Sequence, residues 1–196
     1  MASALAAGFG DPVFDTQAVF RGLMSAIAYP GRVVLIDRIL PTPAPLNVAT
    51  TALCLSLVDF ETPVWLDHSG GSQDVLSHLC FHCGMPVTPD PGAARFALIA
   101  DAVAMPRLSD FDAGEVEYPD RSATIVIQVP SLTDGQRTSW RGPGIERPTL
   151  AAIGGLPENF WQDWDLNRET YPLGVDVFFT CGKAIVGLPR TITVEV

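Results

Sequence analysis

The stretch His78–Cys83 (HLCFHC) holds two of the three histidines and two of the four cysteines of the chain. Zinc is commonly bound by four such side chains, converging in a tetrahedron at about 2.0–2.3 Å. On a helix, His78 and His82 would share one face at positions i and i+4, whereas Cys80 and Cys83 would point largely to the other side. The spacing therefore leaves a metal site open as an alternative but favours packing and helix termination.

Cys80 and Cys83 also have the Cys-x-x-Cys spacing of a redox pair. Such a pair normally begins a helix, where the helix dipole lowers the thiol pKa. Here the pattern falls at the end of a predicted helix over residues 73–80, which is the wrong polarity. We expect these cysteines to pack rather than to react.

Lys183 is the only lysine of the chain, so any Schiff-base chemistry, including that of pyridoxal phosphate, would have to use it. It follows Gly182 in a predicted turn between two strands, where a solvated lysine is the ordinary outcome. A Walker phosphate loop, a Gly-x-Ser-x-Gly motif and a cysteine set for an iron–sulfur cluster are all missing from the sequence. The sequence therefore predicts no cofactor.

Arginines offer a further chemistry, because guanidinium groups match phosphate and phosphonate oxygens in a bidentate manner. Those next to glycine, proline or strand ends are Arg21, Arg137, Arg141 and Arg190. A salt bridge at a surface or an interface is the competing interpretation for each of them.

The elements that must position these side chains follow from the spacing of apolar residues. Helices are expected over residues 15–28, 47–58, 73–80 and 158–167, with Asn47 as the N-cap of the second. Strands are expected over residues 32–36, 63–66, 96–100, 123–129, 137–140, 174–181, 184–188 and 191–196. Residues 123–129 are apolar enough to be central, residues 137–140 are predicted beside them, and residues 174–188 form a hairpin. This alternation predicts a single α/β domain over residues 1–196 with a mixed sheet.

Composition restricts the partners. The 196 residues carry a net charge of −10 without a basic stripe, which argues against nucleic acid and anionic membranes. The apolar share of 47% suggests an additional covered surface, such as a subunit interface. No signal peptide or membrane-spanning segment is evident, so we expect a cytoplasmic protein with reduced thiols.

Several segments, in order along the chain, resemble the PhnH family, the H subunit of the bacterial carbon–phosphorus lyase system. They include Phe20-Arg21-x-Leu23 with Pro30-Gly31, the run PLNxATT from Pro45, and ETPVWL from Glu61. The likeness continues through Phe81-His82, the strand 123–129, GPGI from Gly142, YPLGVD from Tyr171 and LPRT from Leu188. Together these segments extend over nearly the whole chain.

The resemblance implies a three-layer α/β/α fold similar to the large domain of pyridoxal-phosphate-dependent transferases, without pyridoxal phosphate. It implies a homodimer that joins the G, I and J subunits in a core complex, with ATP or a phosphonate bound at an interface. That system attaches a phosphonate to C1 of the ATP ribose and displaces adenine, in the catabolism of organic phosphonates. We expect this chain to support that transfer without activity of its own.

Residue chemistry at or beside the matching motifs gives a predicted ligand-binding set of His82, Arg141, Asp176 and Arg190. Arginines would hold anionic oxygens, His82 could donate a hydrogen bond or a proton, and Asp176 could orient an arginine. Two alternatives belong to other classes: a free-standing metal-dependent enzyme that uses the cluster of His78, Cys80, His82 and Cys83, and a pyridoxal-dependent transferase that uses Lys183.

Overall fold

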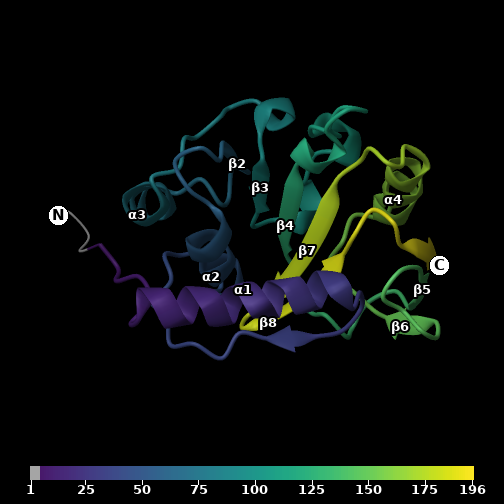
Figure 1. The fold of residues 1–196 in the computed structure, drawn as a ribbon, viewed down its shortest axis with the longest axis horizontal. Coiled ribbons are helices and arrows are strands. Elements are labelled where there is room, and N and C mark those ends of the chain that lie inside the picture. The colour runs from purple at the N-terminus through teal and green to yellow at the C-terminus, as the bar shows by residue number, and fades with distance from the viewer. Residues whose placement is uncertain (1–4) are drawn as a thin grey trace.

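Four apolar segments form the parallel centre of a six-stranded sheet in the computed structural model, which describes residues 5–196 (Figure 1). They are β2 (Val64–Leu66), β3 (Phe96–Ile99), β4 (Thr124–Gln128) and β7 (Asp176–Cys181). The antiparallel strands β8 (Ala184–Leu188) and β1 (Val34–Leu35) extend the sheet beyond β7, in the order β1-β8-β7-β4-β3-β2. Most Val, Ile and Phe side chains of the four parallel strands are buried by layers on both faces, which is the usual environment of parallel strands.

Three helices cover one face of this sheet: α1 (Pro12–Ala28), α2 (Val48–Leu57) and α3 (Gln73–Cys83). Each begins at a side chain that accepts a hydrogen bond from a backbone N–H of the first turn, namely Asp11, Asn47 and Ser72. Their inner side chains pack with Leu98, Val126 and Phe178 of the sheet into one apolar cluster.

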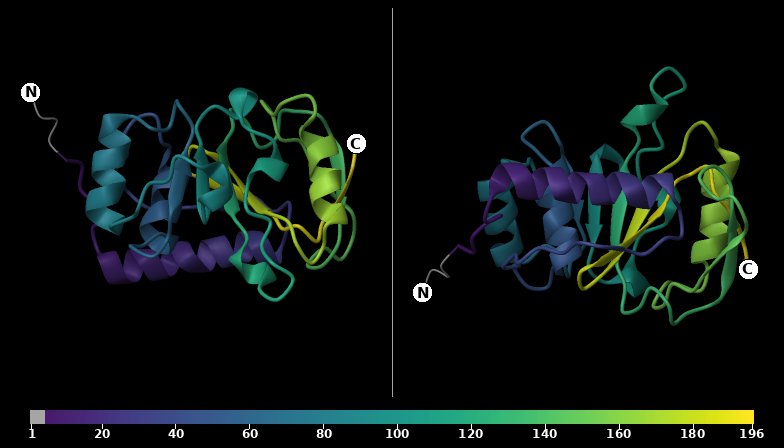
Figure 2. Two further views of the ribbon diagram at one scale, coloured as in Figure 1. Left: turned by 90° about the horizontal axis from the view of Figure 1, so that it is seen from above. Right: turned by 60° about the horizontal axis from the view of Figure 1, so that its bottom comes forward.

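The opposite face is covered by α4 (Phe160–Glu169) and a small antiparallel sheet. This second sheet has the order β6 (Thr149–Ala151), β5 (Thr138–Arg141), β9 (Thr193–Glu195). Trp140 and Trp164 are fully buried between these elements and the main sheet. Figure 2 shows α2 and α3 on one side of the strands and α4 on the other, so the predicted α/β class with a mixed sheet is confirmed.

The sequence prediction was wrong about strand 137–140, which does not lie beside residues 123–129. The neighbours of β4 are β3 and β7, and β5 pairs instead with β6 and β9. The reason lies in burial: β4 is covered on both faces, whereas β5 buries Thr138 and Trp140 and leaves Arg141 exposed. Such alternation is typical of an antiparallel strand with one covered face.

The last turn of α3 also runs beyond the predicted end at residue 80. The helix continues to Cys83 and ends at Gly84, which adopts the left-handed conformation with a φ of 68°. Across residues 5–196, none of the helices is both long and apolar enough to cross a membrane.

Candidate functional site

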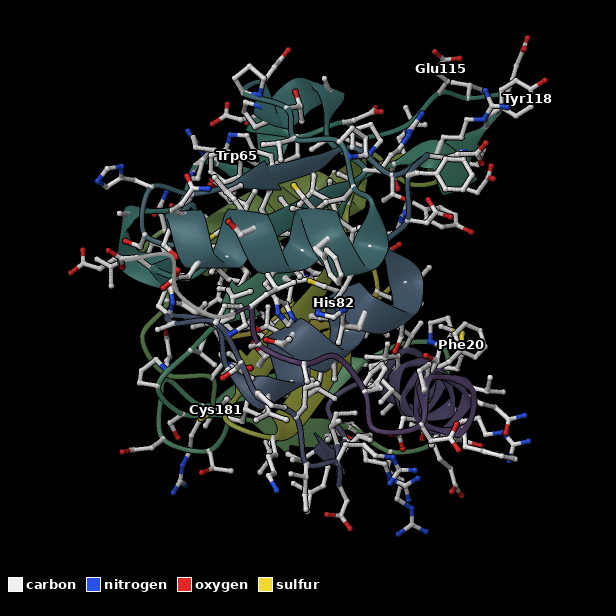
Figure 3. All side chains as sticks on the ribbon, turned by 90° about the vertical axis from the view of Figure 1, so that its left-hand side faces the viewer. Phe20, Trp65, His82, Glu115, Tyr118 and Cys181 are labelled. Carbon is white, nitrogen blue, oxygen red and sulfur yellow. The ribbon has the colours of Figure 1, made fainter. Side chains whose placement is uncertain are left out.

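A pocket of about 500 Å³ opens at the edge of the main sheet where β2, β3 and β4 end. In open α/β sheets, ligands bind in the crevice outside the carboxyl ends of the strands. The turns after these strands, the start of α2 and the β7–β8 turn all contribute to it. Its polar and shape-determining residues include Asn47, Ser69, Asp101, Val103, Gln128 and Gly182. Figure 3 labels Cys181, the last residue of β7 and the neighbour of Gly182, well apart from His82.

Asn47 and Gln128 are held in place by each other and by the backbone. The Asn47 side-chain oxygen accepts from the Thr50 N–H at 2.9 Å, and its amide nitrogen donates to Thr180 Oγ1 at 3.2 Å. Gln128 Oε1 accepts from the Asn47 backbone N–H at 2.6 Å, and Gln128 Nε2 donates to the Pro45 carbonyl at 3.1 Å. Each side-chain amide carries two N–H groups, so each keeps one that these bonds do not use.

Two aspartates follow β2 and β3, and only one of them lines the pocket. Asp67 is buried, and its carboxylate accepts from the backbone N–H groups of Gly70 at 2.5 Å, Ala100 at 2.9 Å and Asp101 at 2.8 Å. It therefore ties the ends of the two strands together. Asp101 is exposed at the pocket, where its Oδ1 accepts from the Val103 N–H at 3.2 Å and its Oδ2 has no hydrogen-bond partner within residues 5–196. This oxygen is available to a ligand.

The electrostatic character of the pocket follows from its lining. Asp101 is its one ionisable side chain, and the described residues that line it include no lysine, arginine or histidine. The remaining polar groups are neutral amides and a hydroxyl, and they alternate with valine and proline carbons. The pocket can therefore bind neutral hydrogen-bonding groups, and none of the described side chains that line it carries a positive charge that would neutralise an oxyanion.

The four predicted ligand residues lie elsewhere, and the structure brings only two of them together. Asp176 begins β7 and Arg190 follows β8, and the antiparallel register pairs Val177 with Leu188. This register places the two side chains next to each other at the amino-terminal end of β7, whereas the pocket lies at the carboxyl ends of the parallel strands. The Arg190 Nη2 donates to Asp176 Oδ2 at 2.5 Å, and its Nε donates to Oδ1 at 3.2 Å.

The other Arg190 donors also have protein acceptors. Nη1 donates to the carbonyls of Pro119 at 3.0 Å and Pro172 at 3.5 Å, and Nη2 donates to Ser122 Oγ at 2.5 Å. The guanidinium is thus satisfied within the protein and joins three segments of chain. A shallow depression of about 310 Å³ lies beside it and is also lined by Asp120, Tyr171 and Asp176.

Arg141 lies on β5 and is separate from this pair. Its Nη2 is 3.4 Å from Glu195 Oε2 on β9, and both side chains are more than half exposed. Such a pair is weak and open to water. Binding of an anion by Arg141 stays a prediction.

His82 lies near the end of α3 beside the N-terminal segment (Figure 3). Its Nε2 donates to the Ala6 carbonyl at 3.0 Å, and a Cβ at Gly8 would come within 3.1 Å of its Nδ1. The His78 ring lies 4.5 Å away between centroids, and neither of its nitrogens has a hydrogen-bond partner within residues 5–196. Burial, and then the proximity of His82, lowers the pKa of His78. The structure gives His82 a hydrogen bond to the N-terminal segment, and its ligand role stays a prediction.

The two cysteines of the same stretch do not complete a metal site. Cys80 is exposed, with its Sγ 3.8 Å from the Met85 carbonyl, and Cys83 Sγ lies 3.6 Å from the Cys54 carbonyl. Burial, and then the proximity of Cys80, raises the pKa of the Cys83 thiol to about 12. Over the described part of the chain, no three His, Cys, Asp or Glu side chains are placed to hold a metal ion. The four side chains on which the metal-enzyme alternative depended therefore do not converge on one point within residues 5–196.

The sequence prediction missed the pocket at the sheet edge, although two segments of the resemblance converge on it. The run from Pro45 to Thr51 contributes Asn47, and the strand 123–129 contributes Gln128. The available signal was a polar residue at the end of each of several buried strands. That signal becomes a site only when the strands are known to be parallel neighbours.

Comparison with known proteins gives a consistent result. A family model described as "Bacterial phosphonate metabolism protein (PhnH)" matches residues 7–195. The chain is 40% identical over 187 residues to a Rhizobium meliloti (strain 1021) protein, with 95% of this chain and 94% of the relative covered. That relative is named "Alpha-D-ribose 1-methylphosphonate 5-triphosphate synthase subunit PhnH". A Stutzerimonas stutzeri protein, "Putative C-P lyase subunit protein HtxG", is 31% identical over 179 residues, with 89% of this chain and 83% of the relative covered.

Proposed function

Because this chain belongs to the PhnH family of bacterial phosphonate metabolism proteins, we propose that it is a subunit of a carbon–phosphorus lyase complex. The observation that carries the proposal is the family match over residues 7–195, together with two relatives whose names describe such subunits. The process it serves is the catabolism of organic phosphonates.

The proposed step is the one named in the Rhizobium relative, formation of ribose 1-methylphosphonate 5-triphosphate. In this step, a phosphonate oxygen forms a bond to C1 of the ATP ribose while the bond from C1 to adenine breaks. We assign this chain a supporting role rather than the chemistry itself. In support, three of the four predicted site residues are already engaged in the fold: Arg190 is paired with Asp176, and His82 donates to the Ala6 carbonyl.

The predicted site residues fit such a role unevenly. Asp176 and Arg190 would serve by building the surface around the depression beside them, because the guanidinium donors already have acceptors. Arg141 keeps an exposed guanidinium that an anion of a neighbouring subunit or a ligand could approach.

We propose the G, I and J subunits as partners, and a homodimer as the form in which this chain joins them. A cytoplasmic location is part of the same proposal. The exposed apolar side chains of α1 support a covered surface, because soluble monomers rarely expose large apolar patches. They are Val13, Phe14, Phe20 and Met24.

Co-expression of the tagged chain with the G, I and J subunits tests this proposal. We expect all four proteins to purify together, and we expect Phe14→Asp to weaken this assembly. Leu166→Asp, which also replaces an exposed apolar side chain by an acid but on α4 at the opposite face of the main sheet, is the matched control. A chain that elutes alone while the other three assemble would refute the proposal.

A further inference from the structure

We propose that the pocket at the carboxyl ends of β2, β3 and β4 binds an uncharged, hydroxyl-bearing sugar ring, and that any phosphate or phosphonate on that ring stays outside it. The inference rests on the proposed function only for the choice of ribose as the sugar, since the name of the Rhizobium relative contains that sugar. The ligand class itself follows from the lining of the pocket.

Charge excludes an oxyanion as the group that enters. Among the described residues that line the pocket, Asp101 alone has an ionisable side chain, and it is an acid. A phosphate or phosphonate there would meet a like charge without a guanidinium or ammonium group to offset it. The nearest cation in sequence is Lys183, an exposed residue next to Gly182 at the rim, where an anionic substituent would meet water.

The hydrogen-bonding groups match hydroxyls. The free Asp101 Oδ2 accepts a hydroxyl hydrogen, and the unused N–H groups of Asn47 and Gln128 donate to hydroxyl oxygens. A hydroxyl acts as both donor and acceptor, so neighbouring hydroxyls on one ring can satisfy both kinds of group. Because both amides are fixed by hydrogen bonds within the protein, little side-chain entropy is lost when a ligand binds.

Size and shape agree with this class. The volume of about 500 Å³ lies in the range of about 300–1,000 Å³ that is typical of small-molecule sites. Val103 and Val129 supply apolar carbons that can pack on the C–H face of a sugar ring. Gly182 leaves its side open, since an added Cβ would meet no atom within 4 Å.

Binding to the ¹⁵N-labelled full-length chain, followed by NMR, tests the proposal with three probes: ribose 5-phosphate, adenine and methylphosphonate. We expect ribose 5-phosphate to shift the side-chain amide signals of Asn47 and Gln128, whereas the other two probes leave them unchanged. Absence of binding by ribose 5-phosphate would overturn the proposal. So would shifts of these signals by adenine alone or by methylphosphonate.

Two variants locate the binding, each with a matched control. Gly182→Asn fills the open side while keeping a residue that tolerates the left-handed backbone, with φ of 58°, and we expect affinity to fall about tenfold or more. Gly84→Asn makes the same change at φ of 68°, at the end of α3. Asp101→Asn removes the charge from the pocket but keeps a side chain that can cap the 3₁₀ helix Ala102–Ala104. Its control is Asp90→Asn, which makes the same change at the N-cap of the 3₁₀ helix Pro91–Ala93. Both controls should leave the affinity unchanged, and an equal loss in a control would overturn the assignment to the pocket.

The same variants separate this inference from the proposed function. If the chain assembles with the G, I and J subunits but does not bind ribose 5-phosphate, only the pocket inference fails. If it binds ribose 5-phosphate but does not assemble, the proposed function fails and the sugar site stands.

Discussion

Replacement of Arg190 by alanine should destabilise the protein strongly, because this guanidinium holds three segments of chain together. Its side chain is only 12% exposed and donates to Asp176, Ser122 and two backbone carbonyls. In Arg190→Ala, these acceptors lose their donor inside the protein. The Asp176 carboxylate would keep the hydrogen bond from the backbone N–H of residue 190 to Oδ1, at 2.8 Å, but would lose its charged partner in a partly buried position.

The magnitude follows from the burial of the pair. Removing one partner of a fully buried ion pair costs about 3–5 kcal/mol. The Asp176 side chain is 28% exposed, so water replaces part of the lost interaction, and about 2–3 kcal/mol is expected. For a chain of this length, each kcal/mol lowers the melting temperature by about 2–4 °C, so the variant should melt about 4–12 °C lower.

Thermal unfolding of both single variants and the double variant measures this effect. Asp176→Ala and Arg190→Ala share one interaction, so the double variant should lose less stability than the sum of the two. Arg141→Ala is the matched control, because its pair with Glu195 is more than half exposed on both sides and contributes at most about 1 kcal/mol.

A change for Arg190→Ala as small as that for Arg141→Ala would refute this reasoning. It would show that the guanidinium is not needed for the fold, and an anion-binding role for Arg190 would then be the better explanation.

Three further predictions concern other parts of the molecule. Asn47→Ala removes the N-cap of α2, so the free energy of unfolding should fall by about 1 kcal/mol or more in chemical denaturation; an unchanged midpoint would contradict the cap. Burial first, and then His82, lowers the pKa of His78 from 6.5, so the unfolded chain binds this proton more tightly than the folded one. The free energy of unfolding should therefore be at its full value above pH about 6.5 and should fall as the pH drops below 6.5. His78→Gln should make this fall smaller; identical profiles of unfolding free energy against pH for the variant and the original protein would be evidence against the pKa shift of His78. A thiol reagent at pH 8 should label exposed Cys80 before Cys83, whose pKa burial raises to about 12, as mass spectrometry would show; faster labelling of Cys83 would contradict the structure.

Features that depend on neighbouring residues were predictable from the sequence. Asn47 was expected to begin a helix, and it accepts from the Thr50 N–H as an N-cap does. The hairpin of β7 and β8 turns at Gly182 and Lys183, as predicted, and the central position of β4 follows from its uninterrupted apolar side chains. Each of these depends on local patterns that a single segment contains.

Features that depend on distant pairing were not predictable. β5 joins the second sheet because its partners, β6 and β9, come later in the chain, and nothing within residues 137–140 specifies them. The hairpin register places Arg190 against Asp176, which the sequence analysis named only as a residue that could orient an arginine, and binding of a ligand by Arg190 stays a prediction. The pocket at the sheet edge was missed for the same reason, since it requires the order of β2, β3 and β4.

The central claim, that this chain works as a PhnH-family subunit of a carbon–phosphorus lyase complex, is tested most directly by the composition of the purified assembly. The tagged chain, expressed together with the G, I and J subunits from the same genome, is isolated and weighed by native mass spectrometry. We predict one assembly that contains all four proteins, with two copies of this chain. An assembly of the G, I and J subunits that lacks this chain would contradict the claim.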